Sequence, residues 1–316
     1  MNLVAGAYAP GTVKNIRSNM RMFVAFMIRN NFQLFPPVVN YIAEFYSFII
    51  NKVKAMGTLQ NHQSSVNTFY KLYGFTVDTS AIIFKLLNMA AKKRLTTVPA
   101  EKPPLEIGHI LAMGDIIDYS DPSQFAFFTA VSIGFMATLR RSNICPPSAA
   151  EYDPAKHLNR QDVVCNSDGV IVVLRWSKTN QAGQQLFKIP IAFSQDSRFD
   201  PPSLFRQFDT ACPVAPSDPC FSFYQHGTLF VMTHQDLSRM LSQFLTAIGV
   251  HAAAYSSHSI RKGGAAIIHR SGIRTELLKQ HGTWRSDAYQ AYLHHSYRDK
   301  LSVSQSVYQH IRALNQ

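Results

Sequence analysis

Apolar residues recur at helical spacing in four stretches of the first hundred residues. In the first stretch, Ile16, Met20 and Phe23 follow one another at intervals of three or four positions, which places them on one face of a helix. The four stretches cover 12–28, 38–53, 59–73 and 81–94. An Asp-Thr-Ser triplet at 78–80 supplies good N-cap residues before the fourth. We therefore predict four amphipathic helices whose apolar faces meet in a bundle core.

The remainder of the chain mixes strand and helix patterns. Apolar runs at 163–165 and 170–176 flank the turn sequence Asn-Ser-Asp-Gly, which favours a β-hairpin. The run 186–191 predicts a third strand, and the Pro-rich segment 200–221 predicts irregular structure. Helical spacing resumes at 105–117, 124–139, 234–248, 260–271, 276–280, 287–294 and 302–314.

These patterns predict a mainly α-helical protein with a small β-sheet, of the α+β class. The sequence Val-Pro-Ala-Glu-Lys-Pro-Pro at 98–104 is typical of a linker. We therefore expect a helical N-terminal domain over 1–97 and a mixed α/β domain over 105–316. A chain of 316 residues is long enough for each domain to have its own core.

Composition narrows the class of protein. Hydrophobic residues make up 46% of the chain and the mean hydropathy is −0.06, which is typical of a globular rather than a disordered protein. No apolar run is long enough for a membrane span, and the N-terminus lacks a secretory signal pattern, so we expect an intracellular protein with no membrane partner. The four cysteines have no Cys-x-x-Cys spacing, so we expect free buried thiols and no metal site.

Positive charge is concentrated near the N-terminus. The chain carries a net charge of +12, and residues 1–100 hold 11 Lys and Arg against 2 acidic residues. Three quarters of the excess therefore lies in the first hundred residues, which indicates a polyanionic partner. Charge alone does not separate DNA from RNA, or either of them from a merely basic domain.

The most specific chemistry lies in the second half of the chain. His258 and Arg261 are three positions apart in a predicted helix and share a face, where an imidazole and a guanidinium can both meet one phosphate. Arg140 adds a second guanidinium, and Lys178 adds an ammonium beside the turn of a second predicted hairpin. Attack on a phosphodiester needs positive charge on the non-bridging oxygens, an in-line nucleophile and an acid for the leaving oxygen.

Each of these residues also has an ordinary interpretation when it is taken alone. A single Arg or His usually serves an ion pair or a structural contact, and Lys178 could be a solvated turn residue. We expect Trp284 either to pack beneath a phosphate with its indole N–H as a donor, or to fill the core, and the two roles are compatible. The pair Gly263 and Gly264 is expected to permit close backbone packing.

The order Arg, Lys, His-x-x-Arg, Trp, Tyr resembles the active-site series of the tyrosine recombinases, the phage-integrase family. Leu-Arg-x-Ser-Asn at 139–143, Ser-Lys-Thr at 177–179 and Gly-x-Trp-x-Ser-Asp at 282–287 resemble patterns of eukaryotic mobile-element recombinases of the Crypton and DIRS types. In this resemblance Tyr292 is the nucleophile, since it lies ten residues after the glycine at the spacing that the family shows. Tyr289 is the second candidate.

Two positions depart from the bacterial pattern of that family. Asn143 stands where bacterial members have Glu, and Thr283 stands where they have a His directly after the glycine. His281 precedes the glycine and is not in register with that His. These departures bear on catalysis rather than on the fold.

The resemblance implies that a helical core-binding domain and a catalytic domain close around double-stranded DNA. The implied catalytic residues are Arg140, Lys178, His258, Arg261, Trp284 and Tyr292. Tyr292 attacks the scissile phosphate to give a 3′-phosphotyrosine and a free 5′-hydroxyl, and a second 5′-hydroxyl reverses the linkage. No metal, ATP or other cofactor is required, because the bond energy is conserved. A homo-tetramer on two DNA sites, in the nucleus, is expected.

Two other classes stay open at the level of sequence. An inactive DNA-binding descendant of a recombinase would keep the fold without cleaving DNA, although all the expected catalytic residue types are present. A type IB topoisomerase shares the Arg, Lys, His and Tyr chemistry and would relax supercoils as a monomer. The helical N-terminal region, with no long linker before the tyrosine, disfavours that class.

Overall fold

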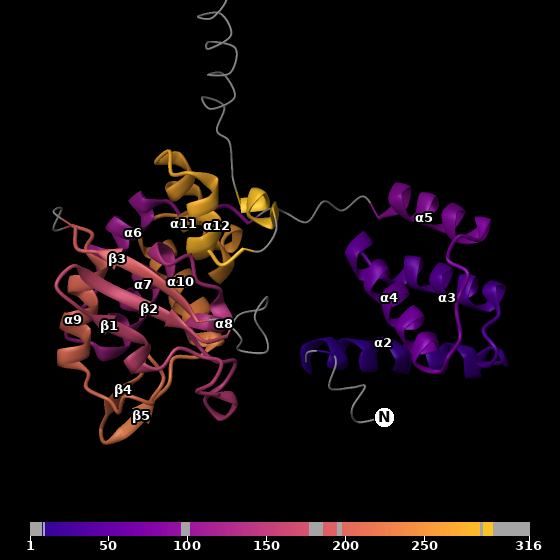
Figure 1. The fold of residues 1–316 in the computed structure, drawn as a ribbon, viewed down its shortest axis with the longest axis horizontal. Coiled ribbons are helices and arrows are strands. Elements are labelled where there is room, and N and C mark those ends of the chain that lie inside the picture. The colour runs from indigo at the N-terminus through magenta and orange to yellow at the C-terminus, as the bar shows by residue number, and fades with distance from the viewer. Residues whose placement is uncertain are drawn as a thin grey trace, which may run out of the picture. The chain divides into compact units, whose positions relative to one another are not determined.

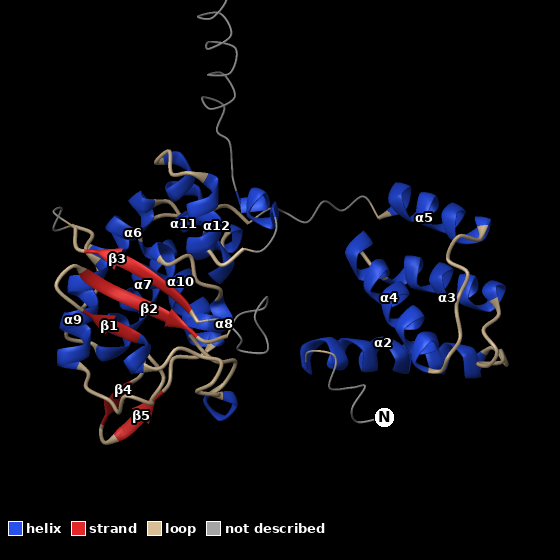
Figure 2. Ribbon diagram, in the orientation of Figure 1, coloured by secondary structure: helices blue, strands red, loops and turns tan. Residues whose placement is uncertain are grey.

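A computed structural model describes residues 8, 10–95, 102–176, 186–194, 198–284 and 287–292. The chain divides into two compact units, Met1–Glu101 and Lys102–Gln316, which are drawn in Figures 1 and 2. Each unit has its own hydrophobic core. In the described residues the first unit is helical and the second combines helices with two small sheets, so the predicted fold class is confirmed. The predicted linker falls largely outside the described residues.

The first unit contains the four predicted helices. They are α2 (Pro10–Arg29), α3 (Val39–Lys52), α4 (Met56–Leu72) and α5 (Ile82–Arg94). Their apolar faces meet in one core, where the rings of Phe23 and Phe45 pack edge to face with centroids 4.9 Å apart. The hydroxyl of the buried Tyr70 donates to the Leu34 carbonyl over 3.0 Å, which fixes the loop before α3 against α4.

The predicted N-cap of the fourth helix is wrong by one residue. Ala81 occupies the N-cap of α5 and makes no side-chain cap. The carboxylate of Asp78 instead accepts hydrogen bonds from the backbone N–H and hydroxyl of Ser80, at 2.9 Å and 2.5 Å. A short polar side chain that satisfies its own neighbours favours a turn, so the triplet forms the turn that precedes the helix.

Helix α7 (Pro122–Met136) is the centre of the second unit. Every residue from Phe125 to Phe135 is buried, and the helix contacts α6, α9, α10, α11 and β4. A helix that is apolar all round is stable only when it is surrounded in this way. The other helices are α6 (Ile107–Gly114), α8 (Arg141–Ile144), α9 (Pro201–Ala211), α10 (His234–Ala247), α11 (Ser257–Arg270) and α12 (Thr275–His281). Short 3₁₀ turns lie at Ala149–Glu151, Arg160–Asp162 and Ala252–Ala254.

The predicted three-stranded sheet is confirmed. Strands β1 (Val163–Cys165), β2 (Gly169–Leu174) and β3 (Phe187–Ala192) pair antiparallel in that order. A separate hairpin, formed by β4 (Phe223–Gln225) and β5 (Thr228–Phe230), is not among the predicted elements. Its turn is His-Gly at 226–227, with both residues at positive φ, which is the geometry of a two-residue hairpin turn.

The prediction of irregular structure over 200–221 is wrong for residues 201–211, which form α9. Asp200 is the N-cap and accepts from the N–H and hydroxyl of Ser203. Two prolines follow it in the first turn, where a missing N–H costs nothing. The side chains of Phe205 and Phe208 are then buried. Pro201 and Pro202 begin this helix, whereas the prediction rests on proline as a residue that excludes a helix.

The C-terminal predictions are met only in part. Residues 287–292 form a 3₁₀ helix, Asp287–Tyr292, where an α-helix was expected. The predicted helix 302–314 lies outside the described residues. None of the helices found in the described ranges is long and apolar enough to cross a membrane.

All four cysteines are free thiols. Three are buried, but Cys165 is exposed, so the expectation of burial is wrong there. Cys165 ends β1, an edge strand on which only the first residue faces the core.

Candidate active site

Three helix ends converge in the second unit. They are the turn between α7 and α8, the first turns of α11, and the turn that follows α12. The side chain of Arg261, from α11, joins the other two, because its terminal nitrogens donate to the carbonyls of Thr138 and Gly282. The structure therefore brings Arg140, His258, Arg261 and Trp284 into one cluster.

Helix α11 reaches this position because of two glycines. A Cβ added at Gly263 would lie 2.0 Å from the Leu105 carbonyl oxygen, and one added at Gly264 would lie 2.0 Å from the Phe135 carbonyl oxygen. Neither contact tolerates a side chain, since the atoms met are backbone. The expected close backbone packing after Arg261 is confirmed.

The guanidinium of Arg261 is enclosed. The residue is 2% exposed, its Nη2 donates to the Gly282 carbonyl over 2.7 Å, and its Nη1 donates to the Thr138 carbonyl. Its Cζ lies 4.1 Å from the centroid of a Trp284 ring. Arg261 thus holds two loops together and contributes a fixed, poorly hydrated positive charge to the cluster.

Trp284 is a packing residue in this structure. It is 7% exposed and belongs to a small core with Ala265, Leu278 and Tyr289. A Cβ at Gly282 would lie 1.6 Å from the indole ring, so only glycine fits at that position. This explains the Gly-x-Trp pattern physically, because the glycine makes room for the indole that lies beneath Arg261.

Arg140 is the more open of the two arginines. It is the N-cap residue of α8 and only partly buried. Its Nη1 lies 3.5 Å from the Thr283 hydroxyl oxygen, a long hydrogen bond. Arg140 therefore presents a guanidinium whose position is set from the turn after α12.

His258 lies in the first turn of α11 with an exposed side chain. Loss of hydration on its inner side lowers the pKa of His258, and the positive charges of Arg261, Lys262 and Arg140 lower it further. The imidazole is therefore mostly neutral at pH 7, with one nitrogen able to donate and the other able to accept a proton.

We expect the protein to lose stability as the pH falls from about 7 to about 5. The histidines with a lowered pKa are His62, His157, His234, His258 and His281. Their folded-state pKa lies below the unfolded value, so the unfolded chain binds more protons as the pH falls and unfolding is favoured. Burial, and then Arg141, lowers the pKa of His234 to about 4.

Denaturation midpoints should therefore be lower at a pH of about 5.5 than at about 7.5, a window in which carboxylates hardly titrate. A His234→Gln variant should show a weaker dependence. Equal midpoints of the wild-type protein at both pH values would contradict this reading of the histidines.

Lys178 lies outside the described residues. The described strands on either side are β2 and β3, and the buried Asn143 donates from Nδ2 to the Trp176 carbonyl over 3.0 Å. A carboxylate cannot donate such a bond, so Asn at this position has a local structural reason. Asn143 thereby ties the turn that carries Arg140 to the end of the strand segment that precedes Lys178.

Of the two candidate tyrosines, the structure describes the surroundings of Tyr289. Tyr289 is 6% exposed, and its ring centroid lies 6.3 Å from that of Trp284. The Lys279 ammonium lies 5.5 Å from the Tyr289 ring centroid. Tyr292 is the last residue of the 3₁₀ helix, and its side chain lies outside what the structure describes. Tyr289 therefore has a clear packing role.

Sequence reasoning missed two kinds of supporting residue. The Nε2 of His281 lies 2.6 Å from the Met136 carbonyl oxygen, which joins the end of α12 to the end of α7. Thr138 and Thr283 have positive φ values of 48° and 56°, and both contact an arginine of the cluster. Only the glycine before Thr283 signalled an unusual turn in the sequence.

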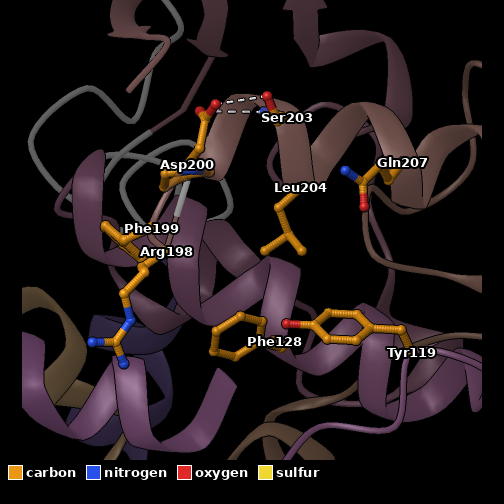
Figure 3. Close-up of a pocket in the computed structure, with 9 residues that line it drawn as sticks. Tyr119, Phe128, Arg198, Phe199, Asp200, Ser203, Leu204 and Gln207 are labelled. Atoms are coloured by element: carbon orange, nitrogen blue, oxygen red, sulfur yellow. Dashed lines mark hydrogen bonds between the residues drawn. The ribbon is translucent and has the colours of Figure 1, made fainter. Parts of the chain in front are cut away.

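A separate cavity of about 180 Å³ lies beside α9 and contains none of the candidate residues. Figure 3 shows Tyr119 and Phe128 facing it, with Asp200 and Ser203 joined by the N-cap hydrogen bonds of α9. Asp200 and Ser203 thus serve the helix end, and we place no function in this cavity. Among residues 10–95, 102–176, 186–194, 198–284 and 287–292, no group of three or more His, Cys, Asp or Glu is placed to hold a metal ion.

Comparison with known proteins finds similarity in fold. No protein-family model and no curated protein sequence matches this chain. The XerH site-specific recombinase, in a post-cleavage complex with a palindromic difH substrate, has a TM-score of 0.64 and 12% identity over 93% of this chain and 78% of that chain.

Two further solved structures are similar over almost their whole length. A variant of the Tn1549 transposon integrase in complex with transposon right end DNA has a TM-score of 0.64 and 14% identity, covering 96% of this chain and 95% of that one. A lambda integrase dimer bound to a COC′ core site has a TM-score of 0.57 and 15% identity, covering 94% and 93%. The chain therefore has the fold of the tyrosine recombinases.

Proposed function

We propose that this protein is a site-specific DNA recombinase that cuts and rejoins strands through a tyrosine. The observation that carries the proposal is that Arg140 and Arg261, which lie far apart in sequence, both contact the turn before the tyrosine segment, with His258 three positions before Arg261 in α11. The shared fold with XerH and the two integrases supports it.

In the proposed reaction the Tyr292 phenol oxygen attacks phosphorus and the bond from phosphorus to the 5′-oxygen breaks. Arg140 contacts a non-bridging oxygen, and the buried Arg261 adds a fixed positive charge nearby. Both arginines stabilise the negative charge that develops in the transition state. His258 accepts the proton that the Tyr292 phenol loses as its oxygen bonds to phosphorus, and Lys178 gives a proton to the leaving 5′-oxygen. A 5′-hydroxyl of a second strand then attacks the phosphotyrosine and releases the tyrosine.

The partner that we propose is double-stranded DNA. In support, the XerH structure is bound to a difH substrate, the Tn1549 integrase is in complex with transposon right end DNA, and the lambda integrase is bound to a core site. We further propose a homo-tetramer on two sites, a mobile-element origin of the Crypton or DIRS kind, action in the nucleus, and a DNA-binding role for residues 1–97. The basic excess of the first hundred residues supports the last of these.

The proposal is tested with a DNA duplex nicked close to each candidate cleavage position, so that the short 5′-hydroxyl strand diffuses away and religation fails. The wild-type protein should accumulate a covalent DNA adduct that survives denaturation. DNA binding without any adduct would favour an inactive descendant, and relaxation of supercoiled plasmid without strand exchange between two sites would favour a topoisomerase.

The N-terminal unit should supply much of the salt dependence of DNA binding. Lys92, Lys93 and Arg94 are exposed together at the end of α5. If each neutralises one phosphate, replacing all three with Gln should make the slope of log K against log salt shallower by about 0.9 per contact.

Titrations at several salt concentrations measure this slope, and circular dichroism checks that α5 is retained. Lys156→Gln is the control, because Lys156 lies in the second unit and already pairs with Asp153. An unchanged slope in the triple variant would mean that this end of α5 faces away from DNA.

A further inference from the structure

Several helices of this chain end in the same way, with a residue in the left-handed region just after the C-cap. After α4, α10 and α11 that residue is a glycine, namely Gly74, Gly249 or Gly272, with φ between 73° and 78°. After α2 it is Asn31, with φ 55°. Glycine and asparagine are the residues that tolerate this conformation best, so these four ends follow the general rule.

The two helices that end at the arginine cluster break this rule. Thr138 follows the C-cap of α7 and Thr283 follows the C-cap of α12. Their N–H groups donate to the carbonyls of Phe135 and Gln280, each over 3.1 Å. The next N–H groups, of Leu139 and Trp284, donate one residue further back in each helix, to Gly134 and Lys279, over 2.8 Å and 2.9 Å. These bonds define the Schellman ending in both helices.

A β-branched residue at positive φ is strained, and such strain persists only where the surrounding structure imposes it. Here it occurs twice, at two buried positions, and each threonine contacts one of the two arginines. The Thr138 carbonyl accepts from Arg261, and the Thr283 hydroxyl oxygen lies 3.5 Å from Arg140 Nη1. The turn after α7 therefore accepts from Arg261 of α11, and the turn after α12 contacts Arg140, which precedes α8.

The turn after α12 holds both guanidinium groups. The Gly282 carbonyl accepts from Arg261 over 2.7 Å, and the next residue offers its hydroxyl to Arg140. A ring of Trp284 also packs against the Arg261 guanidinium, with its centroid 4.1 Å from Cζ. A glycine in place of Thr283 would give the same helix ending without strain, but it would have no group for Arg140.

We propose that Thr283 is a positioning residue for Arg140, retained at a strained position because its hydroxyl fixes the guanidinium that meets the scissile phosphate. The inference rests on the proposed function and assigns to Thr283 a polar contact with Arg140. The β-branched side chain suits this role because its χ1 angle is restricted, which holds the hydroxyl in one direction.

Three substitutions at Thr283 separate the effect of backbone strain from the effect of the hydroxyl group. Thr283→Gly removes both, so it should raise the thermal midpoint and lower the rate of covalent DNA attachment by about 10- to 100-fold. Thr283→Val keeps the branched shape and should lower the rate without raising the midpoint. Thr283→Ser keeps the hydroxyl and should stay within a few-fold of wild type. A Gly or Val variant that cleaves at the wild-type rate would overturn the proposal.

Gly249→Thr is the matched control. It places a threonine in the same ending of α10, where an added Cβ has no heavy atom within 4 Å. It should lower the thermal midpoint and leave the cleavage rate unchanged, which gives the cost of a strained threonine away from the arginines.

The failure of the proposed function is distinguishable from the failure of this inference. If the wild-type protein forms no adduct, the proposed function is wrong. The contact between Thr283 and Arg140 is then tested by measurements of stability alone. Unfolding free energies of Thr283→Val, Arg140→Ala and the double variant should be non-additive. Additive values would show that the two side chains do not interact, and the inference would fall as well.

Discussion

Tyr292→Phe is expected to abolish covalent attachment to DNA while leaving DNA affinity nearly unchanged. The change removes one oxygen atom, the proposed nucleophile, and no positive charge, so phosphate contacts and counterion release are unaffected. The measurement compares adduct formation on a nicked duplex with equilibrium binding to the same duplex. Adduct yield should fall below detection, and the dissociation constant should stay within about twofold, because every positive charge that meets the phosphates is retained.

Tyr289→Phe is the matched control, because Tyr289 lies on the same 3₁₀ helix and packs against Trp284. The ring of Tyr289 makes the packing contact with Trp284, and phenylalanine keeps that ring. The Phe variant should therefore fold and form the adduct. If Tyr289→Phe loses the adduct and Tyr292→Phe retains it, the nucleophile has been assigned to the wrong tyrosine.

Arg261→Ala should be the most damaging single change in the cluster, because it combines a structural with a chemical loss. The guanidinium is buried against Trp284 and donates to the carbonyls of Thr138 and Gly282. Each buried carbonyl left without a donor costs about 1–3 kcal/mol, so the unfolding free energy should fall by several kcal/mol. Cleavage should fall by about 100-fold or more, since a charge near the transition state is also lost.

Arg140→Ala provides the contrast. Arg140 is only partly buried, whereas Arg261 is enclosed, so the change should cost less stability than Arg261→Ala. Cleavage should nevertheless fall by about 100-fold or more, if Arg140 contacts the phosphate directly. Denaturant unfolding and adduct-formation rates, measured on both variants, separate the two roles. Near wild-type cleavage by Arg140→Ala would remove this arginine from the site, and unchanged stability of Arg261→Ala would contradict the geometry around it.

Helices and strands that are long and have regularly spaced apolar residues could be predicted from the sequence. The four helices of the first unit, α10 and the β1–β2–β3 sheet follow directly from apolar spacing and turn residues. Helix α9 was missed because a pair of prolines can either begin a helix, as Pro201 and Pro202 do after the N-cap Asp200, or exclude one. Composition alone does not distinguish that case from a Pro-rich loop.

The candidate site was predictable in its residue types but not in its geometry. The spacing of His258 and Arg261 indicated a shared helix, and the glycines after them indicated close packing. Nothing in the sequence indicated that Arg261 would be enclosed by the carbonyls of Thr138 and Gly282, because these contacts join segments more than twenty residues apart. A threonine at positive φ is likewise set by its surroundings and not by local propensity.

The most direct test of the account is to identify the atom to which DNA becomes attached. A trapped adduct of the wild-type protein is digested with trypsin and nuclease, and the DNA-linked peptide is sequenced by mass spectrometry. The expected peptide, 286–298, contains Tyr289, Tyr292 and Tyr297, and fragmentation distinguishes them. We expect a 3′-phosphate ester on Tyr292. Attachment through a 5′-phosphate, or to a residue outside this peptide, would contradict this expectation.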